Sequence, residues 1–281
     1  MSDRKSSSRS KNQPPVKPVA ENICTVVVND WVNDSYKHLV LDAPLTALTA
    51  QPGQFFHLLC PAAGDDTPFL RRPMSIYRID PANKRVEFLY KVIGPGTRGI
   101  ATLAPGDQFD ILGPIGVGFS LDPAWRHIVV LGRGVGLATL GPLAELAHRT
   151  GVGLTAILSA RSPDLVMSNE LFESYGGEVI NVTDSEGTSA VDNVEAILLK
   201  LIGDKRADAF FTCGSNRLLL LMQRLAEEHG VPGQVALEQQ MACAIGMCQC
   251  CVRPIRNGDE IAHLRVCFEG PVFDLKAAIS W

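Results

Sequence analysis

The feature that most constrains this chain is a short cysteine-rich segment near its carboxyl end, MACAIGMCQCCVRPI. It places Cys243, Cys248, Cys250 and Cys251 within nine positions, and Cys267 follows in RVCFEGPVF. The spacing C-x4-C-x2-C with a more distant fourth cysteine is typical of the ligands of a [2Fe–2S] cluster. Thiolates suit such a centre because they are soft, anionic donors. The segment therefore predicts an iron–sulfur centre bound by Cys243, Cys248, Cys251 and Cys267.

The residues between these cysteines agree with a cluster loop. Ala242, Ala244 and Gly246 are small, so the backbone can wrap closely and direct N–H groups at the cluster sulfurs. Cys250 competes with Cys251 as the third ligand, but the x2 spacing favours Cys251 and leaves Cys250 pointing away. Structural zinc is an alternative, although zinc sites usually contain two paired cysteine knuckles and the fourth cysteine here stands alone.

The overall composition is that of a soluble globular protein with two or more domains. The chain has 281 residues, of which 46% are hydrophobic and 20% charged, with a net charge of −4. This mildly acidic balance gives no support to nucleic-acid binding. No apolar run approaches the ~20 residues that a membrane-spanning helix needs. We therefore expect neither a nucleic acid nor a membrane among the partners.

The amino-terminal segment, MSDRKSSSRSKNQPPVKPVA, is rich in Ser, Lys and Arg and contains little that could be buried. We interpret residues 1–22 as a disordered tail. The segment lacks the apolar core of a secretory signal and the apolar helix face of a targeting presequence. We expect a cytoplasmic location, where thiols stay reduced, so crowded cysteines indicate a metal centre or catalysis rather than disulfides.

Three regions of different sequence texture follow the tail. Residues 23–122 contain short strand-like pieces such as MSIYRI and RVEFLYKVI between Gly and Pro, which predicts an antiparallel β-barrel. In residues 123–235, buried-type strands such as HIVVLG alternate with helical segments such as RLLLLMQRLAEEHG. This alternation predicts an α/β domain with a parallel sheet covered on both faces. Residues 236–281 are too short for a large core, so we expect this region to depend on its bound centre.

A glycine-rich segment, VVLGRGVGLATL, follows the first strand of the α/β region and opens a helix. Gly132, Gly134 and Gly136 would let the backbone turn tightly and approach a pyrophosphate, while the helix N-terminus offers N–H groups to the anion. A tight turn between a strand and a helix needs glycine even without a ligand. For the loop alone, both interpretations stay open.

Two further features of the α/β region lie where ligands commonly bind. Cys213 and Gly214 close the strand AFFTCG, at the predicted carboxyl edge of the parallel sheet. A buried core thiol is the alternative for Cys213. Arg161 comes just after the second strand, where the adenosine end of a dinucleotide would rest, although a solvated arginine fits equally well.

The barrel region contains two segments that could bind a flavin, FLRRPMSIYRI and LYKVIGPGTRGIA. An arginine held before a proline, here Arg71 or Arg72, can make a forked contact with a pyrophosphate. The Ser75 hydroxyl can meet a polar edge of a flavin ring, and the second segment adds backbone donors and the Thr97 hydroxyl. Each feature alone is ambiguous, because arginines are usually solvated and Gly-Pro-Gly is usually a turn.

Taken in order, these motifs resemble those of the ferredoxin–NADP reductase superfamily, and within it the electron-transfer subunit of class B dihydroorotate dehydrogenase. The likeness runs from about residue 23 to the carboxyl end. RRPMSI is similar to the family's flavin-binding Arg-Pro-x-Ser, and VIGPGT with ILGPIGVGF to its flavin-phosphate turn and barrel end. LGRGVGLATL is similar to the nicotinamide-nucleotide loop, and MACAIGMCQCC with RVCFEGPVF to the cluster loop and final cysteine.

The resemblance implies a six-stranded flavin barrel over residues 23–122, a nucleotide domain over 123–235 and a small [2Fe–2S] domain over 236–281. The implied cofactors are FAD, the cluster and NAD(P)H. The implied FAD contacts are Arg72, Pro73, Met74, Ser75, Lys91, Gly96 and Thr97. The implied NAD(P)H contacts are Gly132, Gly134, Gly136, Cys213 and Gly214, with Cys213 beside the nicotinamide as the candidate catalytic residue. The implied cluster ligands are Cys243, Cys248, Cys251 and Cys267.

Several positions depart from the family's pattern. Arg133 interrupts the glycines that usually open the nucleotide loop, and its side chain could point outward, bind phosphate or partly obstruct the cofactor. Ser215 replaces the usual proline after Cys-Gly, and Gln249 and Cys250 are unusual in the cluster loop. These departures suggest a divergent relative, which could serve a dehydrogenase other than the pyrimidine enzyme.

The implied function is electron transfer between NAD(P)H and another protein. Hydride exchange between nicotinamide C4 and flavin N5 is positioning chemistry and needs no general acid or base from this chain. Single electrons would then pass through the cluster to an acceptor, or in the reverse direction. The chain has no substrate-oxidising domain, so we expect a separate flavin-containing dehydrogenase subunit and a hetero-oligomer.

Three other functions remain open on the sequence. A reductase of an oxygenase system can share this domain order, but it should carry a full plant-type ferredoxin domain with a longer gap than that between Cys251 and Cys267. A redox sensor could use the flavin and cluster without turnover. A zinc-stabilised nucleotide-binding protein would contain zinc without iron or sulfide. The choice between NADH and NADPH also stays open.

Overall fold

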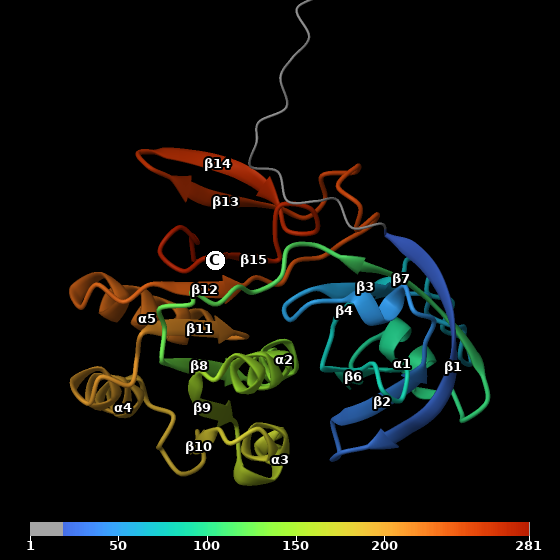
Figure 1. Ribbon diagram of the computed structural model, residues 1–281. Helices are drawn as coiled ribbons and strands as arrows, with labels where there is room; N and C mark the ends of the chain where they lie inside the picture. Colours follow the sequence, from blue (N-terminus) through green and yellow to red (C-terminus); the bar gives the residue numbers. More distant parts are fainter. Residues whose placement is uncertain (1–18, 281) are drawn as a thin grey trace, which may run out of the picture.

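The computed structural model describes residues 19–280, which form two large sheets side by side and a small two-stranded sheet (Figure 1). The first sheet is antiparallel and curls on itself, as predicted for the barrel. It contains β1 (Ala20–Trp31), β2 (Tyr36–Asp42), β3 (Phe55–Leu58), β4 (Arg72–Ser75), β5 (Arg78–Asp80), β6 (Arg85–Lys91) and β7 (Gln108–Ile115). The strand order is β4-β3-β7-β1-β2-β6-β5. A short helix, α1 (Pro95–Ala101), follows β6, and a 3-10 turn covers Ala47–Thr49.

Strand β6 shows how the barrel is filled and how it meets its neighbour. Phe88 and Tyr90 are fully buried in the barrel core, where Tyr90 donates a hydrogen bond to Asn29 Oδ1 at 2.9 Å. Leu89 lies between them in sequence and points to the opposite side, because successive side chains of a strand alternate. There it packs with Tyr36 and Ala138 in a small cluster that joins the barrel to the second domain.

The barrel begins three residues earlier than predicted, at Ala20 rather than at residue 23. Asn22 explains this difference, because its side chain is 1% exposed and its amide donates to the carbonyl oxygens of Ile111 and Gly113. Residues 20–22 therefore belong to β1 and not to a disordered tail. Of the rest of the predicted tail, residues 1–18 lie outside the described residues.

The sheet has seven strands where the resemblance implied six, because the predicted strand MSIYRI is divided. Its first part belongs to β4 at one edge of the sheet and its last part to β5 at the other. Between them, the Ile76 N–H donates to Gln54 O at 3.3 Å and the Tyr77 N–H to Glu87 O at 2.9 Å. The chain thus crosses from one edge strand to the other within two residues.

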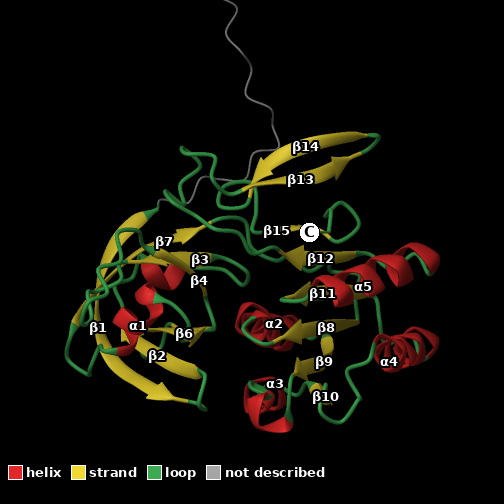
Figure 2. Cartoon of the chain, turned by 180° about the vertical axis from the view of Figure 1, so that it is seen from behind, coloured by secondary structure: helices red, strands yellow, loops and turns green. Residues whose placement is uncertain are grey.

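The second sheet has six strands in the order β10-β9-β8-β11-β12-β15, and the first five are parallel, as predicted. Helices α2 and α3 cover the face toward the barrel, and α4 and α5 cover the other face (Figure 2). The strands are β8 (His127–Arg133), β9 (Gly153–Ala160), β10 (Glu178–Thr183), β11 (Ala209–Cys213), β12 (Gly233–Ala236) and β15 (Val272–Asp274). The helices are α2 (Gly136–Thr150), α3 (Asn169–Ser174), α4 (Val191–Gly203) and α5 (Asn216–Glu228), with a 3-10 turn at Pro163–Leu165.

The continuous apolar run of β8 follows from this double cover. Ile128 and Val130 are buried in the core beneath α2, whereas Val129 and Leu131 are buried in the core beneath α4 and α5. A strand that is covered on both faces needs apolar residues at every position, and not only at alternate ones. No helix within residues 19–280 is both long and apolar enough to cross a membrane.

The predicted small carboxyl-terminal domain, residues 236–281, packs closely against the nucleotide domain. It forms a hairpin of β13 (Val252–Asn257) and β14 (Glu260–Arg265) and then returns to add β15 antiparallel to β12. Its apolar side chains, including Val266 and Leu275, are buried in the same core as those of α5. The region therefore shares much of its core with the nucleotide domain. Its short length alone could not predict this shared core.

We expect Leu275→Ala to destabilise the α/β domain. Leu275 is fully buried, and its N–H donates to Gly233 O at 2.9 Å. Loss of a buried leucine leaves a cavity and lowers the free energy of unfolding by about 2–5 kcal/mol. Leu220→Ala on α5, where the side chain is 47% exposed, is the control. Urea unfolding measures both, and equal stability of the two variants would contradict the shared core.

Candidate cofactor sites

A cavity of about 850 Å³ lies where the barrel, the nucleotide domain and the carboxyl-terminal region meet. This volume falls in the range of sites that enclose a small molecule or cofactor. The barrel contributes both predicted flavin segments, and α2 contributes its first turn. The lining includes Arg72, Pro73, Met74, Ser75, Gly94, Gly96, Thr97, Val135, Ala138 and Thr139. It also includes the segment Leu237–Met241, which follows β12.

The structure distinguishes the two adjacent arginines of the first segment. Arg71 turns away from the cavity and forms ion pairs with Asp110 at 2.7 Å and Glu21 at 2.9 Å. Arg72 lines the cavity, and its side chain runs across Gly96. A Cβ on Gly96 would lie 2.9 Å from Arg72 Cγ, so glycine is needed there for the arginine to pass. Of the two arginines, Arg72 is therefore the one that faces the cavity.

Two other predicted flavin contacts behave differently from each other. Thr97 lines the cavity, but its hydroxyl accepts hydrogen bonds from the N–H groups of Ile93 at 3.0 Å and Gly94 at 3.1 Å. Its main role in this geometry is to hold the turn before α1. Lys91 is not part of the cavity lining, and its Nζ lies 5.7 Å from the centre of the Tyr36 ring.

The predicted nucleotide residues meet at the carboxyl edge of the parallel sheet. A Cβ on Gly136 would lie 2.5 Å from Cys213 O, and one on Gly214 would lie 2.4 Å from Arg133 O. Gly134 and Gly214 also adopt positive φ angles, +56° and +92°. The turn after β8 and the turn after β11 can therefore pack against each other only with glycine at these positions.

This contact accounts for the glycines without any ligand, and it also brings the two turns to one place. Gly132, Gly134, Gly136, Cys213 and Gly214 do not line the cavity themselves. They lie behind Val135 and Thr139, which do, so a nucleotide on this edge would lie next to the cavity.

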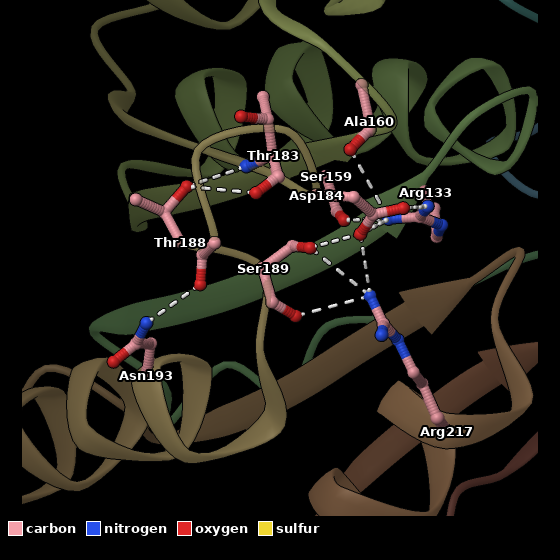
Figure 3. A network of polar contacts seen from close by, with 10 residues as sticks. Arg133, Ser159, Ala160, Thr183, Asp184, Thr188, Ser189, Asn193 and Arg217 are labelled. Carbon is pink, nitrogen blue, oxygen red and sulfur yellow. Dashed lines mark hydrogen bonds and ion pairs between the residues drawn. The ribbon is translucent and has the colours of Figure 1, made fainter.

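The side chain of Arg133 leaves the loop and lies across the ends of the neighbouring strands (Figure 3). It donates to Ser159 Oγ at 2.8 Å and pairs with Asp184 at 2.5 Å. The sequence left open whether this side chain points outward, binds phosphate or obstructs the cofactor. In the structure it turns away from the loop and is held by the Asp184 carboxylate.

Sequence reasoning missed Glu238, which lines the cavity directly after β12. Its position at the carboxyl edge of the sheet was the available signal. Cys213 Sγ lies 4.0 Å from Glu238 Oε1, and the thiol is 2% exposed. Burial, and then the Glu238 charge, raise the pKa of Cys213 well above its usual range, and partial desolvation raises the pKa of Glu238. Cys213 therefore stays a thiol and can act as a hydrogen-bond donor, but it is a poor nucleophile.

The four predicted cluster ligands form two pairs of thiols. The Cys248 N–H points to Cys243 Sγ at 3.3 Å, and the Cys267 N–H points to Cys251 Sγ at 3.4 Å. Cys251 and Cys267 are buried, whereas Cys248 and Cys250 are exposed. Within residues 19–280, no group of three or more His, Cys, Asp or Glu side chains converges as ligands of one metal ion. Two pairs suit a two-iron cluster, in which each iron takes two thiolates.

The loop also presents the backbone geometry that a cluster needs. Ala244, Gly246 and Gln249 have positive φ angles, and these turns direct several N–H groups inward. Burial raises the pKa of Cys243, but hydrogen bonds from the N–H groups of the loop outweigh it and lower the pKa to about 7. Burial and the neighbouring Cys251 raise the pKa of Cys267 to about 12. A sulfur that accepts several N–H groups is stabilised as a thiolate, the form that binds iron.

Arg265 braces the loop from the side of the hairpin. Its Nη1 donates to Gly246 O at 2.7 Å, and its guanidinium lies 4.6 Å from the centre of the Phe268 ring. Arg265 is itself fixed by an ion pair with Glu269, four residues further along the chain. The conformation of the loop is thus held by side chains of the segment around Cys267 that follows it in the chain.

Comparison with known proteins agrees with this geometry. Residues 238–278 match the model of the iron-sulfur cluster binding domain of dihydroorotate dehydrogenase B. The chain is 32% identical over 250 residues to the electron transfer subunit of dihydroorotate dehydrogenase B (NAD(+)) from Streptococcus pneumoniae serotype 4, covering 88% of this chain and 96% of that one. It is 31% identical over 236 residues to the subunit of the same name from Desulforamulus reducens, covering 84% and 89%.

Solved structures share the fold. An NADH-dependent reduced ferredoxin-NADP oxidoreductase, described in a study of flavin-based electron bifurcation, superposes with a TM-score of 0.78 at 24% identity, covering 92% of this chain and 90% of that chain. The ferredoxin reductase of carbazole 1,9a-dioxygenase gives a TM-score of 0.62 at 20% identity, covering 78% and 68%. These likenesses confirm the predicted curled antiparallel sheet followed by an α/β domain.

We expect serine substitutions to separate ligand cysteines from Cys250. Cys243→Ser, Cys248→Ser, Cys251→Ser and Cys267→Ser should each lower bound iron and sulfide and the visible absorbance of the cluster. Cys250→Ser should keep all three near wild-type values, because only its N–H, and not its thiol, contacts a ligand sulfur, Cys248 Sγ at 3.5 Å. Metal analysis of anaerobically prepared protein is the measurement. Zinc in place of iron, or loss of the cluster in Cys250→Ser alone, would contradict this ligand set.

Proposed function

Since this chain belongs to the family of electron transfer subunits of dihydroorotate dehydrogenase B, we propose that it passes electrons between NAD(P)H and a separate flavin-containing dehydrogenase subunit. FAD and a [2Fe–2S] cluster are the carriers in this proposal. One observation supports it above the others. The segment Leu237–Met241 lines the cavity, and the first cluster cysteine, Cys243, follows only two residues later.

The cavity is the proposed FAD site. The guanidinium of Arg72 would bind the FAD phosphates. The turn between Gly94 and Thr97 would lie on the other side of these phosphates. Pro73, Met74 and Ser75 would lie along the flavin ring, on the strand β4 that places them. When bound, FAD exchanges a hydride with the nicotinamide and single electrons with the cluster.

The nicotinamide end of NAD(P)H would enter beside the packed turns after β8 and β11. Thr139 and Glu238 form the polar part of the cavity wall there, with the Cys213 thiol behind Glu238. Thr139 lies in α2, whose amino end would take the pyrophosphate. In this arrangement Cys213 orients Glu238 and does not react with the nucleotide, so its predicted catalytic role becomes one of positioning.

The partner subunit would dock over the outer side of the cluster loop. Met247 is 78% exposed and Phe268 is 54% exposed, and both flank the exposed ligand Cys248. Exposed apolar side chains at one place commonly mark an interaction surface. We place the complex in the cytoplasm, without a membrane or nucleic acid. The dehydrogenase that copurifies with this chain would identify the substrate of the partner.

We expect Arg72→Gln to weaken FAD binding about tenfold or more, because one charge-assisted hydrogen bond contributes about 1.5–3 kcal/mol. Arg98→Gln is the matched control, since Arg98 lies in α1 and pairs with Asp66 outside the cavity. Fluorescence titration of flavin-depleted protein measures both dissociation constants. Equal FAD affinity in the two variants would remove Arg72 from the site.

We expect Cys267→Ser to separate the two halves of the electron path. This variant should still bleach its flavin on anaerobic mixing with NADH or NADPH, but it should fail to reduce the partner dehydrogenase. Cys250→Ser should perform both steps. Steady turnover with an artificial acceptor excludes a non-catalytic sensor, and absence of any bleaching in wild-type protein would refute the proposed function.

A further inference from the structure

The carboxyl edge of the parallel sheet carries a cluster of three arginines that the proposed electron path does not use. Arg133 ends β8, Arg161 follows β9 by one residue, and Arg217 lies in the first turn of α5. Figure 3 shows Arg133 and Arg217 both reaching Asp184, Arg133 from the right and Arg217 from below. The backbone joins Arg161 to the same place, because the Ser185 N–H donates to Arg161 O at 3.0 Å.

Asp184 holds two of these arginines in position. It pairs with Arg133 at 2.5 Å and with Arg217 at 3.1 Å, and the Ser189 hydroxyl donates to it as well. Arg133 is fixed further by Ser159 Oγ at 2.8 Å. The hydrogen bond from Arg133, followed by that from Ser189, lowers the pKa of Asp184 to about 2, so this carboxylate is charged throughout the physiological range.

The arginines of this edge are not all engaged in ion pairs. Beside the three arginines lie two carboxylates, Asp184 and Glu186, and the Glu186 carboxylate accepts a hydrogen bond from the Thr183 hydroxyl at 2.6 Å. In the described part of the chain, Arg161 forms no ion pair. Burial raises the pKa of Tyr36, Arg133 and Arg161 lower it, and Glu238 raises it further. Arg133 and Arg161 therefore both lie near the Tyr36 hydroxyl, which is itself beside Gly134 of the nucleotide loop.

Dinucleotide-binding folds recognise the adenosine ribose at the end of the second strand of the parallel sheet, which here is β9. An acidic side chain there binds the 2′-hydroxyl of NAD, whereas an arginine accommodates the 2′-phosphate of NADP. In this chain β9 ends in Ser159 and Ala160 and is followed by Arg161. The nearest carboxylate, Asp184, comes from the next strand and is already occupied by Arg133 and Arg217.

On the premise of the proposed function, we propose that Arg133, Arg161 and Arg217 bind the 2′-phosphate of NADPH and make NADPH the preferred nucleotide of this chain. A phosphate monoester carries about −1.5 to −2 charges near pH 7 and pairs well with arginine forks. The pyrophosphate is not the ligand of this cluster, because it belongs at the start of α2, whereas the Arg133 guanidinium lies across the ends of β9 and β10. The curated relatives carry NAD(+) in their names, so this proposal sets the chain apart from them.

Calorimetric titration of the purified holoprotein with adenosine 2′,5′-bisphosphate and with AMP tests the proposal. The two probes differ only in the 2′-phosphate. We expect the bisphosphate to bind at least about tenfold more tightly, and Arg133→Gln and Arg217→Gln each to remove most of that difference. Arg206→Gln is the control, since Arg206 pairs with Glu178 at the opposite edge of the sheet and should leave the difference intact.

Equal affinity for the two probes, no measurable binding of either, or an unchanged preference in both Arg133→Gln and Arg217→Gln would overturn the proposal. Loss of the preference in Arg206→Gln as well would also overturn it, because the effect would then follow from general destabilisation. Flavin bleaching by NADH and NADPH is read separately. If the nucleotides bleach the flavin but the two probes bind equally, the electron-transfer function stands and the 2′-phosphate site is refuted. If the bisphosphate binds more tightly but neither nucleotide bleaches the flavin, the 2′-phosphate site stands and the electron-transfer function is refuted.

Discussion

The rest of the site depends on the return of the carboxyl-terminal chain to the edge of the nucleotide sheet. Strand β15 pairs with β12, and the Leu237 N–H donates to Pro271 O at 2.9 Å. These contacts fix the segment that follows β12 against the barrel, where it closes the cavity. Because the same segment continues into the cluster loop, the position of the cluster relative to the cavity is set by ordinary sheet pairing and core packing.

A second constraint is the close contact between the turns after β8 and β11. Glycine at positions 136 and 214 allows two backbones to approach within the space of a methyl group. Beside this contact Thr139 lines the cavity, and the side chain of Arg133 lies along the ends of β9 and β10, where it contacts Ser159 and Asp184. The glycines of such a loop therefore serve packing and ligand access together, and neither explanation excludes the other.

Local patterns were sufficient to predict the curled antiparallel sheet and the α/β domain. For the site, the spacing of the cysteines proposed four ligands, and the resemblance proposed Arg72, which lines the cavity. The sequence could not predict features that depend on distant partners. Glu238 joins the site only because β12 ends beside the cavity, Lys91 misses it because it lies over Tyr36, and β15 exists only because β12 offers a free edge. Arg133 was noticed, but its direction depends on Asp184, 51 residues away.

The central claim is that the cavity and the cluster loop form one electron path. The most direct test is anaerobic reduction by NADH or NADPH of cluster-replete protein with and without FAD, followed by the absorbance and electron paramagnetic resonance of the cluster. The account predicts cluster reduction only in the protein that contains FAD, and its recovery when FAD is added back. Equal cluster reduction without FAD, or a cluster that stays oxidised while the flavin is fully bleached, would contradict it.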